Sequence, residues 1–177
     1  MNKLSFNFNT QIGVNHIVFG LNLQEDIEIF GKSLDRLEWK QARSATLLKD
    51  NSNYISIFLE YQEEELFHIE LNFRHSNERL EVLWDTVNLV ELSFNELSHL
   101  LKSQDKDTKA YSYPPYSISS RNLGLELIFD PYKGLDENGM ANMDTLLPTK
   151  IGVFSTKRFS RLHDLYGFLQ DLGSDFY

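Results

Sequence analysis

The sequence predicts one α+β domain, 1–177, built on an antiparallel β-sheet meander with two short helices and a C-terminal helix. Three runs rich in β-forming residues, 54–61, 65–73 and 79–84, follow one another with connections too short for crossover helices. Helix-start signals occur twice, and a further helical pattern ends the chain. The 177 residues, of which 41% are hydrophobic, are enough for one core without a metal or a disulfide.

The first elements follow from short periodic patterns. Leu4, Phe6 and Phe8 recur at period two, which predicts a strand with one apolar face. A second short apolar run, 14–19, ends at Gly20. We therefore expect the chain to enter its first helix after two extended segments.

Two segments, 21–31 and 92–102, begin with the same capping signal. Asn22 and Ser93 are good N-cap residues, and a glutamate follows each of them three positions later. The two helix starts match in residue class position by position. This match indicates either a weak internal duplication or two helices that use the same capping chemistry.

The 65–73 run alternates between two faces. Its apolar residues at odd positions alternate with Leu66, His68, Glu70 and Asn72. Such alternation is typical of an antiparallel strand that is covered on one side and wet on the other.

The second half of the chain combines strands with loops. We expect strands at 123–130 and 150–154, a polar connection at 102–110 and a long loop at 131–148. Apolar residues at helical spacing predict the final helix at 159–173.

The composition narrows the classes of partner. Acidic residues outnumber basic ones by 26 to 17, which gives a net charge of −9 and disfavours nucleic acid. An acidic surface attracts basic proteins, although such a charge also simply aids solubility. The chain has no cysteine, no apolar stretch at its start and no long apolar run. We therefore expect a cytoplasmic protein that does not bind membranes.

No motif for catalysis, for a cofactor or for phosphate binding occurs in the sequence. His68 and Glu70 share one strand face, and with His16 or His99 they could form a metal site or an acid–base pair. The alternative is an ordinary solvated sheet face, and we expect no enzyme, no cofactor and no metal.

One loose pattern fits metal-dependent nucleases. Asp26 followed by Glu38 and Lys40 has the spacing of two magnesium-binding carboxylates and a lysine. The pattern is short and common by chance, and Asp26 lies in a predicted helix rather than on a strand.

An acidic cluster surrounds one predicted hairpin turn. It comprises Glu60, Glu63, Glu64 and Glu65. Like charges at a turn are commonly a solvated tip, but they also create a local negative field that speeds association with a basic partner.

A tyrosine and proline segment offers a second candidate contact surface. Tyr111, Tyr113 and Tyr116 surround Pro114 and Pro115. Tyrosines provide large rigid contact area, and prolines reduce the entropy lost on ordering. The alternative is that these rings pack over the sheet.

Several segments together match a known arrangement. They are Phe19-Gly20-Leu21-Asn22-Leu23, Glu25-Asp26-Ile27 and Phe30-Gly31, followed by the helix at 92–101 and by Asn122-Leu123-Gly124-Leu125-Glu126-Leu127. This arrangement resembles the immunity proteins of bacterial polymorphic-toxin loci. The resemblance implies a cytosolic protein that binds and blocks one cognate toxin, and it implies no catalytic residues.

Together these features predict a non-enzymatic protein-binding domain, and in particular an immunity protein that occludes the active surface of a basic toxin. The alternatives are an interaction or scaffold domain with another protein partner, or a metal-dependent hydrolase or nuclease.

Overall fold

The architecture comes from a computed structural model of the chain. It describes residues 4–9, 12–22, 25, 35–37, 42–49, 54–74, 80–113, 115–131 and 135–156. The final helix predicted at 159–173 lies outside the described residues, and so does nearly all of the helix predicted at 21–31.

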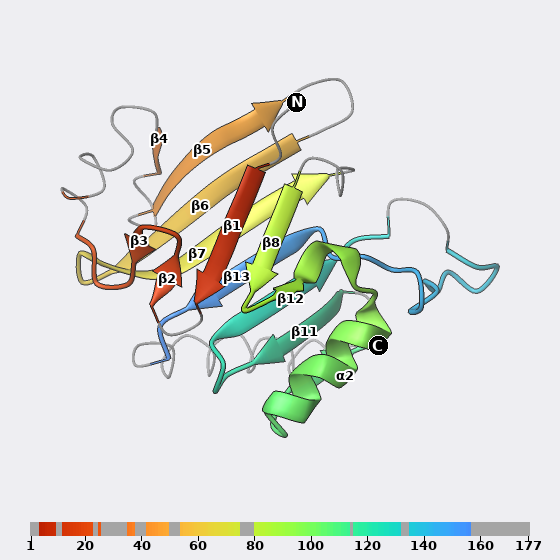
Figure 1. The fold of residues 1–177 in the computed structure, drawn as a ribbon. Helices are drawn as coiled ribbons and strands as arrows, with labels where there is room; N and C mark the ends of the chain where they lie inside the picture. Colours follow the sequence, from red (N-terminus) through yellow and green to blue (C-terminus); the bar gives the residue numbers. More distant parts are fainter. Residues whose placement is uncertain are drawn as a thin grey trace, which may run out of the picture.

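A large antiparallel sheet forms the back layer of the molecule in Figure 1. Its eight strands, in spatial order, are β10 (Lys109–Tyr111), β11 (Tyr116–Ser120), β12 (Leu125–Phe129), β13 (Lys150–Phe154), β7 (Glu65–Arg74), β6 (Tyr54–Gln62), β5 (Ala42–Lys49) and β4 (Asp35–Leu37). All neighbouring pairs are antiparallel. The predicted antiparallel sheet is therefore present, and β13 has the predicted bounds.

A second, mixed sheet contains the N-terminal strand. Its five strands are β3 (Ile17–Val18), β2 (Gly13–Val14), β1 (Leu4–Asn9), β8 (Leu80–Trp84) and β9 (Val87–Asn88), in spatial order. The prediction that 79–84 continues the meander is wrong, because β8 pairs in parallel with β1. This pairing places Leu80 and Val82 beside the buried rings of Phe6 and Phe8. The alternation of residues in β1 had predicted that these two rings share one face of the strand.

One α-helix is present in the described part of the chain, together with the 3-10 turn η3 (Leu89–Glu91). The helix, α2 (Phe94–Gln104), begins with the predicted capping box between Ser93 and Glu96. The same reciprocal bonds join Asn22 and Glu25 at 3.0 and 2.9 Å. The capping chemistry is thus seen at both positions, while the expectation of two short helices is not confirmed.

The core lies between the two layers. Figure 1 shows the small sheet and α2 in front of the large sheet. One face of the large sheet contributes Ile57, Ile69 and Ile151, and α2 contributes Leu97 and Leu101 to the same buried cluster. Burial of this apolar surface is the main stabilising term for the fold.

The opposite face of the large sheet carries His68, Glu70 and Asn72, as predicted, and all three are partly buried. Leu66 is the exception, because it is buried in the core. A β-bulge between Glu60 and Tyr61 places Leu66 opposite Tyr61, and the side chains of both therefore face inward.

The connection after α2 differs from the polar loop predicted at 102–110. Asp105 is buried and accepts hydrogen bonds from Ser120 Oγ (2.5 Å), Asn122 Nδ2 (2.9 Å) and the Asp107 amide (3.0 Å). Burial raises the pKa of Asp105, but these hydrogen bonds outweigh burial and hold it below its ordinary value. The connection is therefore fixed to β11 by one buried carboxylate.

Within the described residues, no helix has the length and apolar character that crossing a membrane requires.

Candidate functional site

The acidic hairpin joins β6 to β7 through a two-residue loop. Glu63 and Glu64 form this loop, and both are exposed. Their φ angles are +52° and +68°, the positive values that a type I′ turn requires at both positions. Asn-Gly is the favoured pair there, and a residue with a side chain costs about 1–2 kcal/mol in this backbone region. The turn thus holds two adjacent carboxylates in place at a conformational cost.

The other two members of the predicted acidic cluster do not lie at the tip. Glu60 projects from the outer face of β6, and its Oε2 is 3.4 Å from His68 Nδ1. Glu65 begins β7, is partly buried and forms a β-bridge with Asn22. The structure therefore divides the cluster into an exposed pair and two anchored residues.

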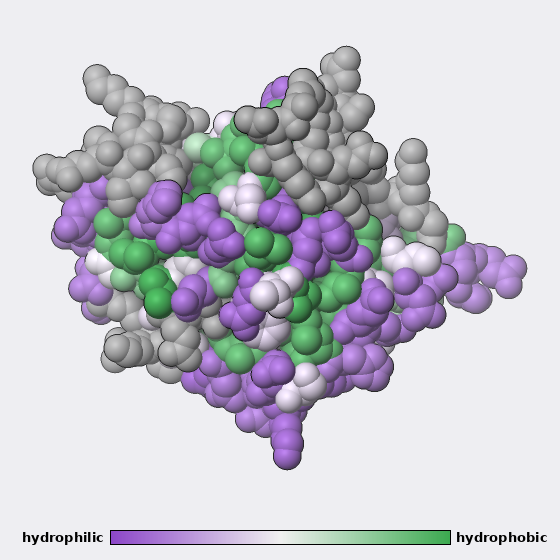
Figure 2. Space-filling view, viewed as in Figure 1, coloured by the Kyte–Doolittle hydropathy of each residue, from purple (hydrophilic) through white to green (hydrophobic). Residues whose placement is uncertain are grey.

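A β-hairpin of the small sheet lies beside the acidic tip. The Gly20 amide donates to the Leu66 carbonyl at 2.9 Å, and the Leu66 amide donates to the Leu21 carbonyl at 2.7 Å. The β2–β3 hairpin just before this contact exposes Ile12 (53%) and Val18 (39%). Figure 2 shows hydrophobic surface over this hairpin with polar surface around it. We call the exposed pair Glu63 and Glu64, together with Ile12 and Val18, the acidic-end surface.

The apolar part of this surface was missed by sequence reasoning, which treated 14–19 as a single run. Gly13 allows the tight hairpin, because it has φ +141° and a Cβ there would lie 1.9 Å from the Ile17 carbonyl oxygen. The sequence signal that could have predicted this hairpin is Gly13 followed two residues later by Asn15, which also has positive φ.

The three tyrosines occupy different environments. Tyr113 is 57% exposed, and its ring meets that of the partly buried Tyr111 edge-on, with centroids 5.9 Å apart. Tyr116 is only 1% exposed, and its hydroxyl accepts a hydrogen bond from the Ala141 amide at 3.0 Å. Tyr116 thus follows the alternative interpretation, in which the ring packs within the fold, and it offers no surface to a partner.

The acidic tip and the tyrosines do not form one surface. In the large sheet, β7 and β11 are separated by β13 and β12, and successive antiparallel pairings make β11 antiparallel to β7. The starts of these two strands therefore lie at opposite ends of the sheet (Figure 1). The acidic tip is at one end, and Tyr111 and Tyr113 are at the other.

A polar cluster on the outer face of the large sheet was only partly predicted. Glu126 on β12 is opposite Gly152 on β13, which is in turn opposite Glu70 on β7. Burial raises the pKa of Glu126 and the Glu70 charge raises it further, whereas attraction to His68 and Lys150 opposes the rise. The alternation of apolar and polar residues in β12 predicts that Glu126 faces outward, but only the strand order shows that Glu126 is a neighbour of His68.

The residues of the predicted metal-site alternative do not converge. His16 and His99 are exposed in the layer of the small sheet and α2, whereas His68 lies on the outer face of the large sheet. Among the residues that the structure describes, no three His, Asp or Glu side chains are grouped so that they could hold a metal ion. Asp26, Glu38 and Lys40 of the nuclease pattern lie outside the described residues.

No protein-family model, curated protein or solved structure matches this chain significantly.

Proposed function

We propose that this chain is a non-enzymatic binding domain for a basic protein, and that it acts as an immunity protein that covers the active surface of a cognate bacterial toxin. The observation that carries the proposal is the conformation of the acidic hairpin. Glu63 and Glu64 are both exposed in left-handed backbone, at a turn where residues other than glutamate would be more stable.

The surroundings of the hairpin support a protein interface. Exposed apolar side chains, Ile12 and Val18, lie on the neighbouring hairpin and supply surface that a partner can bury. The carboxylates at the tip, within a chain of net charge −9, supply a negative field that steers a positively charged partner. An apolar centre beside a charged rim is the usual composition of a specific interface.

The resemblance to immunity proteins suggests the identity of the partner. Such a protein acts in the cytoplasm, where it meets the toxin before the toxin reaches its target. An interaction domain for a different basic protein could use the same acidic-end surface. A toxin gene directly beside the gene for this chain supports the first role, and its absence supports the second.

The test uses matched charge reversals. The product of the adjacent gene is co-expressed with wild-type protein, with Glu64→Lys or with Glu137→Lys, which reverses an exposed charge at the other end of the molecule. We expect Glu64→Lys to weaken both co-purification and protection of cell growth, while Glu137→Lys behaves as wild type. Equal protection by all three proteins contradicts the proposal.

A further inference from the structure

The outer face of the large sheet has little solvent exposure, although no described strand or helix lies over it. The small sheet and α2 both pack against the opposite face (Figure 1). An antiparallel sheet with one uncovered face leaves the side chains of that face in water. On the outer face, however, the side chains of His68 and Glu70 are only 14% and 17% exposed. Such low exposure indicates that this face has a cover.

Phe154 gives the clearest sign of the cover. It is directly opposite His68 in the pairing of β13 with β7, so its ring lies on the outer face, and it is not part of the buried cluster between the two layers. The ring is nevertheless only 1% exposed. Neighbours within a sheet leave the top of a ring open, whereas a fully buried side chain contacts roughly 6–12 residues. Phe58 and Ile128, both partly buried, are the other large apolar side chains of this face.

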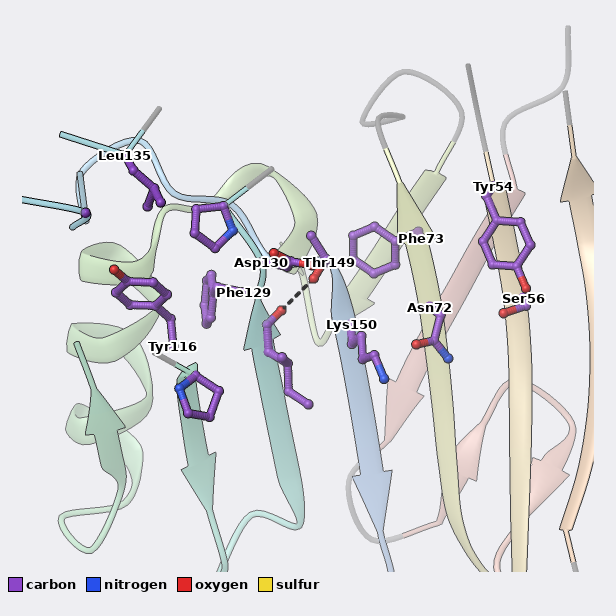
Figure 3. Close-up of a pocket in the computed structure, with 14 residues that line it drawn as sticks. Tyr54, Ser56, Asn72, Phe73, Tyr116, Phe129, Asp130, Leu135, Thr149 and Lys150 are labelled. Carbon is purple, nitrogen blue, oxygen red and sulfur yellow. Dashed lines mark hydrogen bonds between the residues drawn. The ribbon is translucent and has the colours of Figure 1, made fainter. Parts of the chain in front are cut away.

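A pocket marks one end of the covered face. It has a volume of about 810 Å³ and opens at the strand ends away from the acidic tip. Figure 3 shows Ser56, Asn72 and Lys150 side by side in its lining, and their pairing places all three on the outer face. Lys150 is 43% exposed there. The cover therefore spans the face from Phe154, near the acidic tip, to the edge of this pocket.

Residues 157–177 follow the described part of the chain at the acidic-tip end of this face. β13 ends at Phe154, and the Ser155 amide donates to the Phe67 carbonyl at 2.7 Å, which holds the chain beside the start of β7. The fifteen-residue helix that the sequence predicts at 159–173 has a length of about 22 Å. Phe154 and Lys150 are four positions apart on β13, or roughly 14 Å. The helix is therefore long enough to cross the face to the pocket.

The segment has an apolar stripe that suits this face. Its large apolar residues recur at helical spacing. They are Phe159, Leu162, Tyr166 and Leu169. A helix with one such stripe is stable when the stripe is buried against another apolar surface, and the outer face offers Phe154 among its polar side chains.

The charges of the segment and of the face are opposite. Three carboxylates lie on the outer face and are partly buried: Glu60, Glu70 and Glu126. Three of the first five residues of the segment are basic: Lys157, Arg158 and Arg161. Opposite charges attract more strongly where water is excluded than they do in bulk solvent.

We propose that residues 157–177 dock as a helix on the outer face of the large sheet, with the apolar stripe against Phe154, Phe58 and Ile128 and the basic first turn near Glu60. The domain then has three layers, and the polar cluster of the outer face lies between the sheet and this helix. The outer face is thus closed to other proteins, while the acidic-end surface stays outside the contact.

The test uses a spin label on the full chain. Because the sequence has no cysteine, Asp164→Cys gives one labelling site, on the side of the helix away from the stripe. We expect the label to broaden the amide signals of β7, β12 and β13. The broadening of α2 should be smaller by about ten-fold or more, because α2 lies beyond the sheet and a layer is about 10 Å thick. Broadening centred on α2, or absent from the large sheet, overturns the proposal.

Two substitutions in the labelled protein form a matched pair. Leu162→Asp places a carboxylate in the stripe, and Ser160→Asp places one on the other side of the helix. We expect Leu162→Asp to reduce the broadening of β13 by about ten-fold, because a charge is costly to bury, and Ser160→Asp to leave it unchanged. Equal effects of the two substitutions contradict docking through the stripe. The measurement without either substitution needs no destabilised variant, so it decides the proposal on its own.

A mixed sample distinguishes docking within one chain from docking on a second copy. Isotope-labelled wild-type protein is mixed with spin-labelled protein that carries no isotope. We expect no broadening of β13 in this sample. Broadening there as strong as in the singly labelled chain shows that the segment binds a second copy, and it overturns docking within the chain.

Discussion

The imidazole of His68 occupies the space that Gly152 leaves on the neighbouring strand. A Cβ at position 152 would lie 2.7 Å from His68 Nε2, while His68 Nδ1 is 3.4 Å from Glu60 Oε2. The position of the His68 imidazole is therefore set by the Glu60 carboxylate on β6 and by the absence of a side chain at Gly152 on β13. Gly152 also sits between Glu126 and Glu70, so the same gap shapes the whole polar cluster.

Gly152→Ala is expected to destabilise the protein by about 1–3 kcal/mol, because the added methyl overlaps the partly buried imidazole. Urea unfolding measures the change. In a His68→Ala background the same substitution should cost clearly less, since the overlapping atoms are gone. An equal cost in both backgrounds would show that His68 is not what Gly152 accommodates.

Glu126→Gln should change how stability depends on pH. The folded-state pKa of Glu126 is raised above its ordinary value of 4.5, so the native state binds the proton more tightly than the unfolded state does. Wild-type stability therefore falls as pH rises from that value towards the raised pKa.

In the Glu126→Gln variant this loss disappears, and the free energy of unfolding at neutral pH should equal or exceed that of wild type. Urea unfolding at a series of pH values measures it, with the exposed Glu137→Gln as control. A Glu126→Gln curve parallel to that of wild type would refute a raised folded-state pKa at Glu126.

Asp105→Ala should destabilise the protein by roughly 2–3 kcal/mol, because it leaves donors from β11 and the following turn without their acceptor. The folded pKa of Asp105 is lowered, so its contribution is present above the ordinary value of 3.8 and is lost as pH falls through the folded pKa. Thermal unfolding between neutral and acidic pH measures both effects. Asp107→Asn, at an exposed neighbour, should change little.

Replacing Glu63 and Glu64 by Asn-Gly should raise the free energy of unfolding by roughly 1–2 kcal/mol, because this pair relieves the left-handed backbone. The same change should weaken binding of the basic partner, since both exposed carboxylates are lost. Chemical unfolding and titration calorimetry separate the two effects. A variant that is more stable and binds equally well would show that the turn is not maintained for recognition.

Local signals predicted the elements whose conformation depends on near neighbours. The capping box of Ser93 and Glu96, the alternation in β7 and the bounds of β13 all rest on residues a few positions apart. The same capping signal at Asn22 proved correct in its hydrogen bonds. Interactions between residues a few positions apart can thus be predicted from a single sequence.

Relationships between distant segments were not predictable in the same way. Leu4 pairs with Leu80, and nothing in either strand specifies a partner so far along the chain. The proximity of Glu126 to His68 depends on the order of the strands in the sheet. The lining of the pocket depends on which strands end side by side. These features arise from packing of the two layers and not from any one segment.

The most direct test of a basic protein partner is the rate at which that partner associates with the acidic-end surface. Stopped-flow mixing with the product of the adjacent gene, from about 50 to about 500 mM NaCl, should show association that slows steeply with salt, because screening removes the attraction. Glu63→Gln combined with Glu64→Gln should flatten that dependence while leaving dissociation less affected. An association rate independent of salt, or a dependence that the double variant leaves intact, would contradict recognition through the acidic hairpin.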